Sequence, residues 1–146
     1  DALFVFEKEA AMPRETYYRS VFLIGAIWNW LVTLSFAAGY KVLFPLFGMS
    51  LPVCPVFFLL FLGLCFVFGI GYYWVSKDIL KNHDIIKLGI IAKLYVFLMA
   101  LWAVWTGQTH IIFLGAGVVD LFFAALYLEF LLSYQKAVKK ALVGAV

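Results

Sequence analysis

The feature that most constrains the fold is a long run without any charged residue, Val53–Val75. Three further apolar runs share its length of about 19–23 residues, enough for a helix to cross a hydrocarbon core about 30 Å thick. They are Val21–Gly39, Ile85–Thr106 and Ile111–Leu132. Because lipid offers no hydrogen bonds, a spanning segment must satisfy its own backbone, which a helix does. The sequence therefore predicts an all-α, four-helix transmembrane bundle.

The amino-acid composition also indicates that lipid surrounds most of the chain. Hydrophobic residues make up 66% of the chain and charged residues only 13%, whereas soluble domains average about 25% charged residues. We expect an N-terminal segment 1–19, a transmembrane domain 20–133 and a basic tail 134–146, none of which leaves room for a soluble catalytic domain. Met12 reads as a natural start, so the sequence leaves open whether residues 1–11 are native.

Basic residues predict the orientation of the bundle, because short loops rich in lysine and arginine stay in the cytoplasm. Nine of the 11 basic residues fall in the N-terminal segment, in the connection between the second and third runs or within three residues of it, or in the C-terminal tail. Lys41 alone falls in the other two connections, and Lys93 falls within a run. Both termini are therefore predicted to be cytoplasmic, in a multi-pass protein of the bacterial inner membrane.

The connection Lys41–Pro55 is apolar but contains Pro45, Pro52 and Gly48. Prolines are expected to end the first helix there, because proline lacks a backbone N–H and clashes with the preceding turn. Two interpretations stand. The connection is an apolar loop that packs on the lipid headgroups, or it is a lid over a cavity.

Polar residues inside the apolar runs are the main functional signal, because each is costly in lipid without a partner. Helix rise places Lys93 about 10 Å, Asn29 about 13 Å and Asp120 about 18 Å from the cytoplasmic face. A lysine stem is long enough to join the three groups, so we expect Lys93 to pair with Asp120 beside Asn29. Tyr72 is a weaker candidate. Glu129 lies nine residues after Asp120, on the opposite side of its helix, and is expected to stay outside the cluster.

Small residues flank the polar ones on four helical stripes, which indicates that these faces point into the bundle. The stripes are Gly25, Asn29 and Thr33; Cys65, Gly69, Tyr72 and Ser76; Gly89, Lys93 and Ala100; and Gly117, Asp120, Ala124 and Tyr127. The cluster is either structural, fixing the order of the helices, or the polar floor of a ligand pocket.

Other chemistry has weaker support. His83 and His110 fall on opposite membrane faces and cannot share a metal or a haem. We expect no cofactor and no metal. We also expect no nucleic-acid partner, because the positions of the lysines follow the membrane topology and do not form a basic stripe.

The order of motifs resembles a known group. The motifs are WN in the first run, GIGYYWVSKD at the end of the second, LGIIAKL in the third and GAGVVDLFFAALYLEFL in the fourth. This resembles small four-helix bacterial membrane proteins of uncharacterised function, DoxX-like in size and layout. By that resemblance, Asn29, Tyr72, Asp78, Lys93 and Asp120 match the polar positions of the group. Some DoxX-like proteins are associated with quinone-linked oxidoreductase assemblies.

Three functions remain open from the sequence. The favoured one is binding, with or without transport, of a small or lipophilic ligand at Asn29, Tyr72, Lys93 and Asp120. The second is a non-catalytic subunit or assembly factor of a membrane complex, respiratory by the resemblance. The third is an enzyme acting on a lipophilic substrate, with Lys93 and Asp120 as acid and base. Membrane lipid is the expected surrounding, and a homo-oligomer is an alternative to a larger complex.

Overall fold

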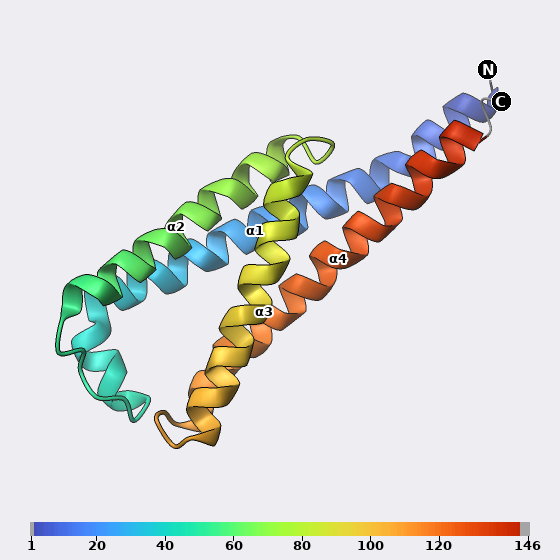
Figure 1. Ribbon diagram of the computed structural model, residues 1–146. Helices are drawn as coiled ribbons and strands as arrows, with labels where there is room; N and C mark the ends of the chain where they lie inside the picture. The colour runs from blue at the N-terminus through green and yellow to red at the C-terminus, as the bar shows by residue number, and fades with distance from the viewer. Residues whose placement is uncertain (1, 144–146) are drawn as a thin grey trace.

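The computed structural model describes the backbone of residues 2–143 and the side chains of residues 14–134. Its helices are α1 (Ala2–Leu46), α2 (Pro55–Lys77), α3 (His83–Trp105) and α4 (Leu114–Val143), with a 3₁₀ turn η1 (Ile111–Phe113) before α4 (Figure 1). All four α-helices contain a stretch long and apolar enough to cross a membrane. The prediction of an all-α, four-helix membrane bundle is confirmed. The side chains of Lys8 and of the basic tail lie outside the described part.

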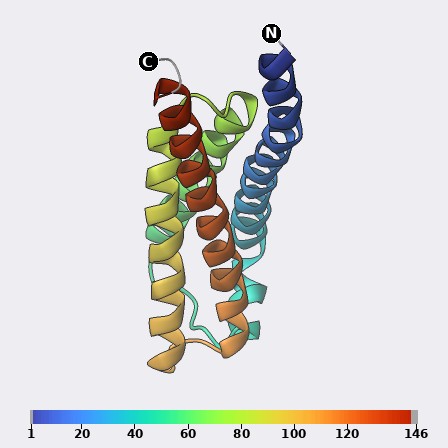
Figure 2. The same cartoon turned by 90° about the vertical axis from the view of Figure 1, so that its right-hand side faces the viewer.

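The four helices associate as two pairs, α1 with α2 and α3 with α4, and contacts between the pairs are sparser. The pairs meet near the end that carries Arg14, the connection 78–82 and Tyr134, here called the terminal end. They diverge toward the end that carries the connections 47–54 and 106–110, here called the linker end (Figures 1 and 2). The bundle is therefore closed at one end and splayed at the other.

Aromatic packing joins the pairs at the terminal end. The rings of Phe22 on α1 and Tyr127 on α4 stack at a centroid distance of 4.6 Å, and the rings of Tyr18 and Phe130 meet edge-on at 4.9 Å. Phe22 and Tyr127 are fully buried. Burial of such large rings makes this end the core of the molecule.

The linker end is held together by two hydrogen bonds to one backbone carbonyl group. The carbonyl of Phe47 accepts one hydrogen bond from the Thr109 hydroxyl at 2.9 Å and another from the His110 amide at 2.8 Å. These bonds tie the end of α1 to the connection before α4. The connections thus hold the two pairs together at the linker end, although their helices have diverged there.

The first helix ends within the connection Lys41–Pro55, as the prolines predicted, but beyond Pro45, because α1 includes Pro45 and continues to Leu46. A proline this close to the end of a helix removes only one internal hydrogen bond, the one that Lys41 would accept. Two residues after the last helical residue, Gly48 has a positive φ of 66°. The Met49 amide donates to the Phe44 carbonyl and the Gly48 amide to the Pro45 carbonyl, the pattern of a Schellman cap.

Candidate functional site

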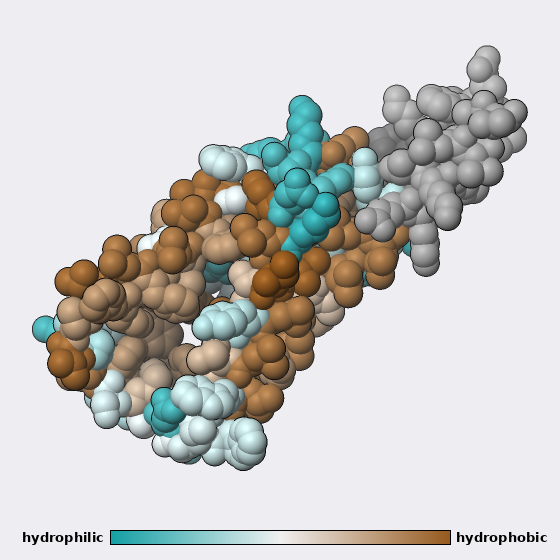
Figure 3. Space-filling view, in the orientation of Figure 1, coloured by the Kyte–Doolittle hydropathy of each residue, from teal (hydrophilic) through white to brown (hydrophobic). Residues whose placement is uncertain are grey.

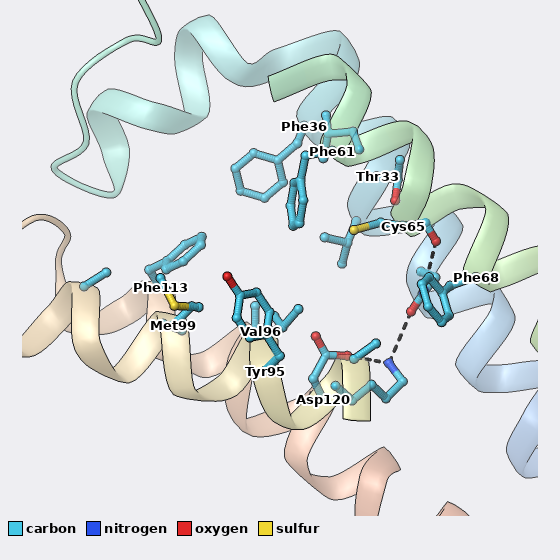
Figure 4. A pocket seen from close by; sticks show the side chains of 18 of the residues that line it. Thr33, Phe36, Phe61, Cys65, Phe68, Tyr95, Val96, Met99, Phe113 and Asp120 are labelled. Carbon is cyan, nitrogen blue, oxygen red and sulfur yellow. Dashed lines mark hydrogen bonds and ion pairs between the residues drawn. The ribbon is translucent and has the colours of Figure 1, made fainter. Parts of the chain in front are cut away.

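Lys93 is the centre of a polar cluster where the two helix pairs begin to diverge. Its ammonium nitrogen lies 2.5 Å from Oδ1 of Asp120 and 3.2 Å from Oδ1 of Asn29. The amide nitrogen of Asn29 in turn donates to the main-chain carbonyl of Cys65 at 3.0 Å. The cluster therefore connects α1, α2, α3 and α4 through three side chains and one carbonyl group (Figure 4). The predicted convergence of Asn29, Lys93 and Asp120 is confirmed.

The helical stripes explain why these side chains meet. Every residue of the four predicted stripes is buried or half-buried, whereas the opposite faces of the helices are lined with exposed apolar side chains. Glycine allows the close contacts that this requires. A Cβ added to Gly69 would lie 2.5 Å from the Trp30 indole nitrogen, and a Cβ added to Gly89 would lie 2.6 Å from the Tyr72 ring.

Lys93 is almost completely enclosed. Its side chain is only 4% exposed, whereas that of Asp120 is 15% exposed. The ammonium lies 5.4 Å from the ring centre of Tyr72 and 5.2 Å from that of Phe123. Aromatic faces attract cations through the negative charge of their π systems. Tyr72 therefore belongs to the cluster as a ring beside the ammonium.

A cavity of about 490 Å³ extends from this cluster toward the linker end. Small-molecule sites commonly have volumes of about 300–1,000 Å³. The cavity walls are mainly aromatic and aliphatic, with Phe36, Phe61, Phe68, Val96 and Met99 around the space in Figure 4. Along α3 the lining runs from Ala92 to Ala103, which corresponds to about 16 Å of helix. The space is therefore elongated, with one polar end and apolar sides.

The cavity opens sideways between α2 and α3, where the helices separate. Phe61 on α2 and Tyr95 on α3 line the cavity and are also 48% and 59% exposed. Figure 3 shows a hollow between these helices in the middle of an apolar surface. Because that surface would face lipid, the opening connects the cavity with the hydrocarbon core.

The connection after α1 forms part of the cavity wall. Phe44 and Met49 line the cavity, together with Phe113 of η1. The ring of Phe36 contacts those of Phe44, Phe47 and Phe113 at centroid distances of 6.0–6.5 Å. This agrees with a lid over the cavity, although the exposed side chains of Leu46 and Leu51 also leave this segment a lipid-facing surface.

Two of the polar residues considered from the sequence lie outside the cavity. Asp78 ends α2 and forms an ion pair with Lys81 at 3.1 Å. Glu129, as expected, stays apart from the cluster and accepts a hydrogen bond from the Tyr18 hydroxyl at 3.0 Å. Among the described side chains, no three histidine, cysteine or acidic residues lie together as a metal site.

Sequence reasoning missed the aromatic walls of the cavity and its opening. In the sequence, Phe61 and Tyr95 cannot be told apart from lipid-facing residues, and in the structure they are 48% and 59% exposed, much like the lipid-facing Leu98 at 58%. The one available signal was the stripe Asn29, Thr33 and Phe36, which continues the polar face of the first helix into an aromatic residue. Comparison of the chain with models of known families, with curated proteins and with solved structures found no match.

Proposed function

We propose that this protein binds a lipophilic small molecule inside the membrane, with the polar end of the ligand at Asp120 and its apolar part along the aromatic walls. The observation that supports this most directly is the elongated cavity of about 490 Å³ that begins at the Lys93–Asp120 ion pair. A cluster that served only to fix helix order would be stabilised by close packing around it, because voids forfeit dispersion contacts. Here the ion pair borders open space instead.

The sideways opening supports a ligand that arrives from the bilayer. Lipophilic molecules concentrate in the hydrocarbon region, and the opening at Phe61 and Tyr95 lies within the apolar stretches of α2 and α3. Gln108, which is exposed in the connection 106–110, also lines the cavity, but at that end Thr109 and His110 hold the connection in place by hydrogen bonds to the Phe47 carbonyl. Entry from the lipid requires no opening of these hydrogen bonds.

Binding is testable with 11-bromo-1-undecanol, because bromine quenches tryptophan fluorescence on contact and Trp28 and Trp102 line the cavity. Exposed Trp74 and Trp105 are first replaced by phenylalanine to reduce quenching from the bulk lipid, which still reaches Trp102, 46% exposed, and adds a component that does not saturate. In lipid nanodiscs, a filled cavity produces quenching that saturates at a low mole fraction of probe. Partition into the bilayer alone produces quenching that rises without saturation.

A matched pair of variants on α3 locates the binding. Val96→Phe fills the cavity, whereas Leu98→Phe changes a residue that is 58% exposed and does not line it. We expect Val96→Phe to abolish the saturable quenching and Leu98→Phe to preserve it. Absence of saturable quenching in the parent protein, or equal behaviour of the two variants, contradicts the proposal.

The location and orientation proposed for the protein rest on its charges. The described basic side chains Arg14, Arg19, Lys77, Lys81 and Lys87 all belong to the terminal end, and Lys41 belongs to the linker end. The positive-inside rule then places the terminal end in the cytoplasm and the linker end outside. A bacterial inner membrane is the setting in which this arrangement and the DoxX-like layout agree.

The two other functions are less well supported by the cavity. An enzyme would use Asp120 as an acid or base, but that carboxylate is engaged by Lys93 at 2.5 Å. A subunit of a larger complex would present a stripe of small residues to the lipid. Within residues 14–134, the glycines with no neighbouring atoms within 4 Å of an added Cβ are Gly63 and Gly115 on different helices, and Gly107 in a connection.

A further inference from the structure

Among the three groups of the cluster at the polar end of the cavity, one oxygen or nitrogen atom has no hydrogen-bond partner within the described part of the chain, and the chemistry of that atom limits what can bind. Two of the three N–H groups of Lys93 have acceptors. Its ammonium donates to the carboxylate of Asp120 and to the amide oxygen of Asn29. The faces of Tyr72 and Phe123 lie against it, and its side chain is 4% exposed. A ligand in the cavity therefore meets little of this cation.

Asn29 is engaged as well. Its oxygen accepts from Lys93, and its nitrogen donates to the carbonyl of Cys65 at 3.0 Å. Rotation of the amide by 180° would place its nitrogen against the ammonium and its oxygen against a carbonyl, so both contacts would become repulsive. The orientation of the amide is thereby fixed, and Asn29 supports the ion pair.

Asp120 differs from its two neighbours. Only Oδ1 contacts Lys93, and within residues 14–134 no partner is found for the second oxygen, Oδ2. The side chain is 15% exposed and lines the cavity, and Figure 4 shows the second oxygen pointing toward the open space. An ionised carboxylate accepts about four hydrogen bonds in all. The cavity thus presents a hydrogen-bond acceptor at its polar end.

We propose that the site selects an uncharged lipophilic molecule with a hydroxyl group, an alcohol or a phenol, which donates its proton to Oδ2 of Asp120. This inference rests on the proposed function and specifies the chemical class of its ligand. Thr33 lies one helical turn farther toward the linker end. Its hydroxyl donates and accepts, so it does not change the preference set by Asp120.

Charge explains why the ligand is uncharged. Lys93 and Asp120 together carry no net charge, so the site does not compensate a charged ligand for the water that it loses. An anion would also face the free carboxylate oxygen. A cation would be attracted to that oxygen but would bring a second positive charge beside Lys93. A hydroxyl group supplies the missing donor without either cost.

The test compares four probes that share the 11-bromoundecyl chain and differ in the head group: the alcohol, its methyl ether, a sulfonate and a trimethylammonium. Each is titrated into nanodiscs containing the protein with Trp74 and Trp105 replaced by phenylalanine, and the mole fraction of probe in the lipid at half-saturation is measured. The methyl ether keeps the oxygen but cannot donate. The trimethylammonium keeps a positive charge but also cannot donate.

We expect the alcohol to reach half-saturation at a mole fraction at least about tenfold lower than the ether, a factor that corresponds to about 1.4 kcal/mol, near the lower limit for a hydrogen bond to a charged group. The sulfonate is expected to be the weakest. In the variant Lys93→Met with Asp120→Leu, the alcohol and the ether should bind equally, because the acceptor is gone.

The possible results separate the two proposals. Equal saturable binding of alcohol and ether overturns the hydroxyl inference but leaves the ligand-binding function standing. Strongest binding of the trimethylammonium or the sulfonate shows that charge, not donation, selects the ligand, and also overturns it. Quenching that saturates for none of the four probes overturns the binding function itself. A preference for the alcohol that survives in the double variant assigns the donor contact to another residue and refutes the role of Asp120.

Discussion

Lys93 and Asp120 are predicted to depend on each other for stability. Their charged atoms lie 2.5 Å apart, and their side chains are only 4% and 15% exposed. Replacing Lys93 by methionine preserves most of the side-chain volume but leaves the carboxylate without its cation. Replacing Asp120 by leucine leaves the Lys93 ammonium without its anion. Asn29 is then the one remaining hydrogen-bond partner of Lys93 among the described side chains.

The expected loss of unfolding free energy follows from the cost of breaking a buried ion pair and from the surroundings of Asp120. Breaking a buried ion pair costs about 3–5 kcal/mol in soluble proteins. The cavity beside Asp120 admits polar contacts that soften the penalty. We therefore expect each single variant to lose about 2–3 kcal/mol of unfolding free energy, and the double variant to regain at least half of the summed loss.

The assay is reversible unfolding in mixed micelles of a mild detergent and sodium dodecyl sulfate, followed by circular dichroism. Lys87→Met provides the control, because Lys87 forms a comparable ion pair with Asp84 at 2.8 Å in which the two side chains are 58% and 94% exposed. Exposed pairs contribute little, so this variant should match the parent. Additive losses in the double variant would refute the reasoning, since they would mean that the two charges do not compensate each other.

Four further predictions concern packing, an unpaired hydroxyl group, membrane orientation and an exposed ion pair. Gly89→Ala should destabilise the bundle by about 1–3 kcal/mol, because the new methyl group would lie 2.6 Å from the buried Tyr72 ring. Gly63→Ala on α2 should not, because no atom lies within 4 Å of the Cβ that it adds; unfolding in mixed micelles compares the two variants. Tyr127→Phe should leave stability unchanged or raise it by up to about 1 kcal/mol, because the Tyr127 hydroxyl is buried without a hydrogen-bond partner; a loss in the same assay would show that this oxygen is engaged. With Cys54 and Cys65 replaced by alanine, a membrane-impermeant maleimide should label Gln108→Cys from outside and Asn82→Cys only from inside, and the reverse pattern would invert the proposed orientation. A hydrogen bond from Lys81 lowers the pKa of the exposed Asp78 carboxyl below its ordinary value, so the contribution of this turn is present at neutral pH and is lost as the pH falls through the lowered pKa; Lys81→Met should raise the pKa of Asp78 in an NMR titration.

The sequence was sufficient for the helices and for the cluster, because both depend on information local to each helix. Hydrophobic length identifies a span, and spacing of three or four residues identifies the buried face, which placed Asn29, Lys93 and Asp120 together. Even Asp120, predicted about 8 Å deeper than Lys93, is reached by the length of the lysine side chain. The prolines predicted that the first helix ends within Lys41–Pro55 but not at which residue, because proline is disfavoured in helix interiors and much less so in the last turn, where few hydrogen bonds remain to be lost.

The cavity could not be predicted in the same way, because it depends on the angle between the helix pairs. Periodicity shows which face of a helix is buried but not how far away the opposing helix lies. Val96 and Met99 would read equally well as residues that touch a partner directly. Their position beside open space follows from the splaying of the pairs (Figure 1), which only the packing of all four helices determines.

The distribution of glycine over the two ends provides a physical reason for that splaying. At the terminal end, glycines face the opposite pair: an added Cβ on Gly25 of α1 would clash with the Tyr127 hydroxyl of α4, and one on Gly89 of α3 would lie 2.6 Å from Tyr72 of α2. Toward the linker end, Gly117 faces Ala100 and Phe97 within its own pair. The residues between the pairs there are bulky, with Phe36, Phe61 and Phe113 on the cavity wall. Small residues let helices approach, so the pairs meet where Gly25 and Gly89 make room for the rings of Tyr127 and Tyr72, and they diverge where bulky side chains face each other without such glycines. The ion pair of Lys93 and Asp120 lies at the boundary between these two regions, which is why one cluster both joins the helices and forms the polar end of the cavity.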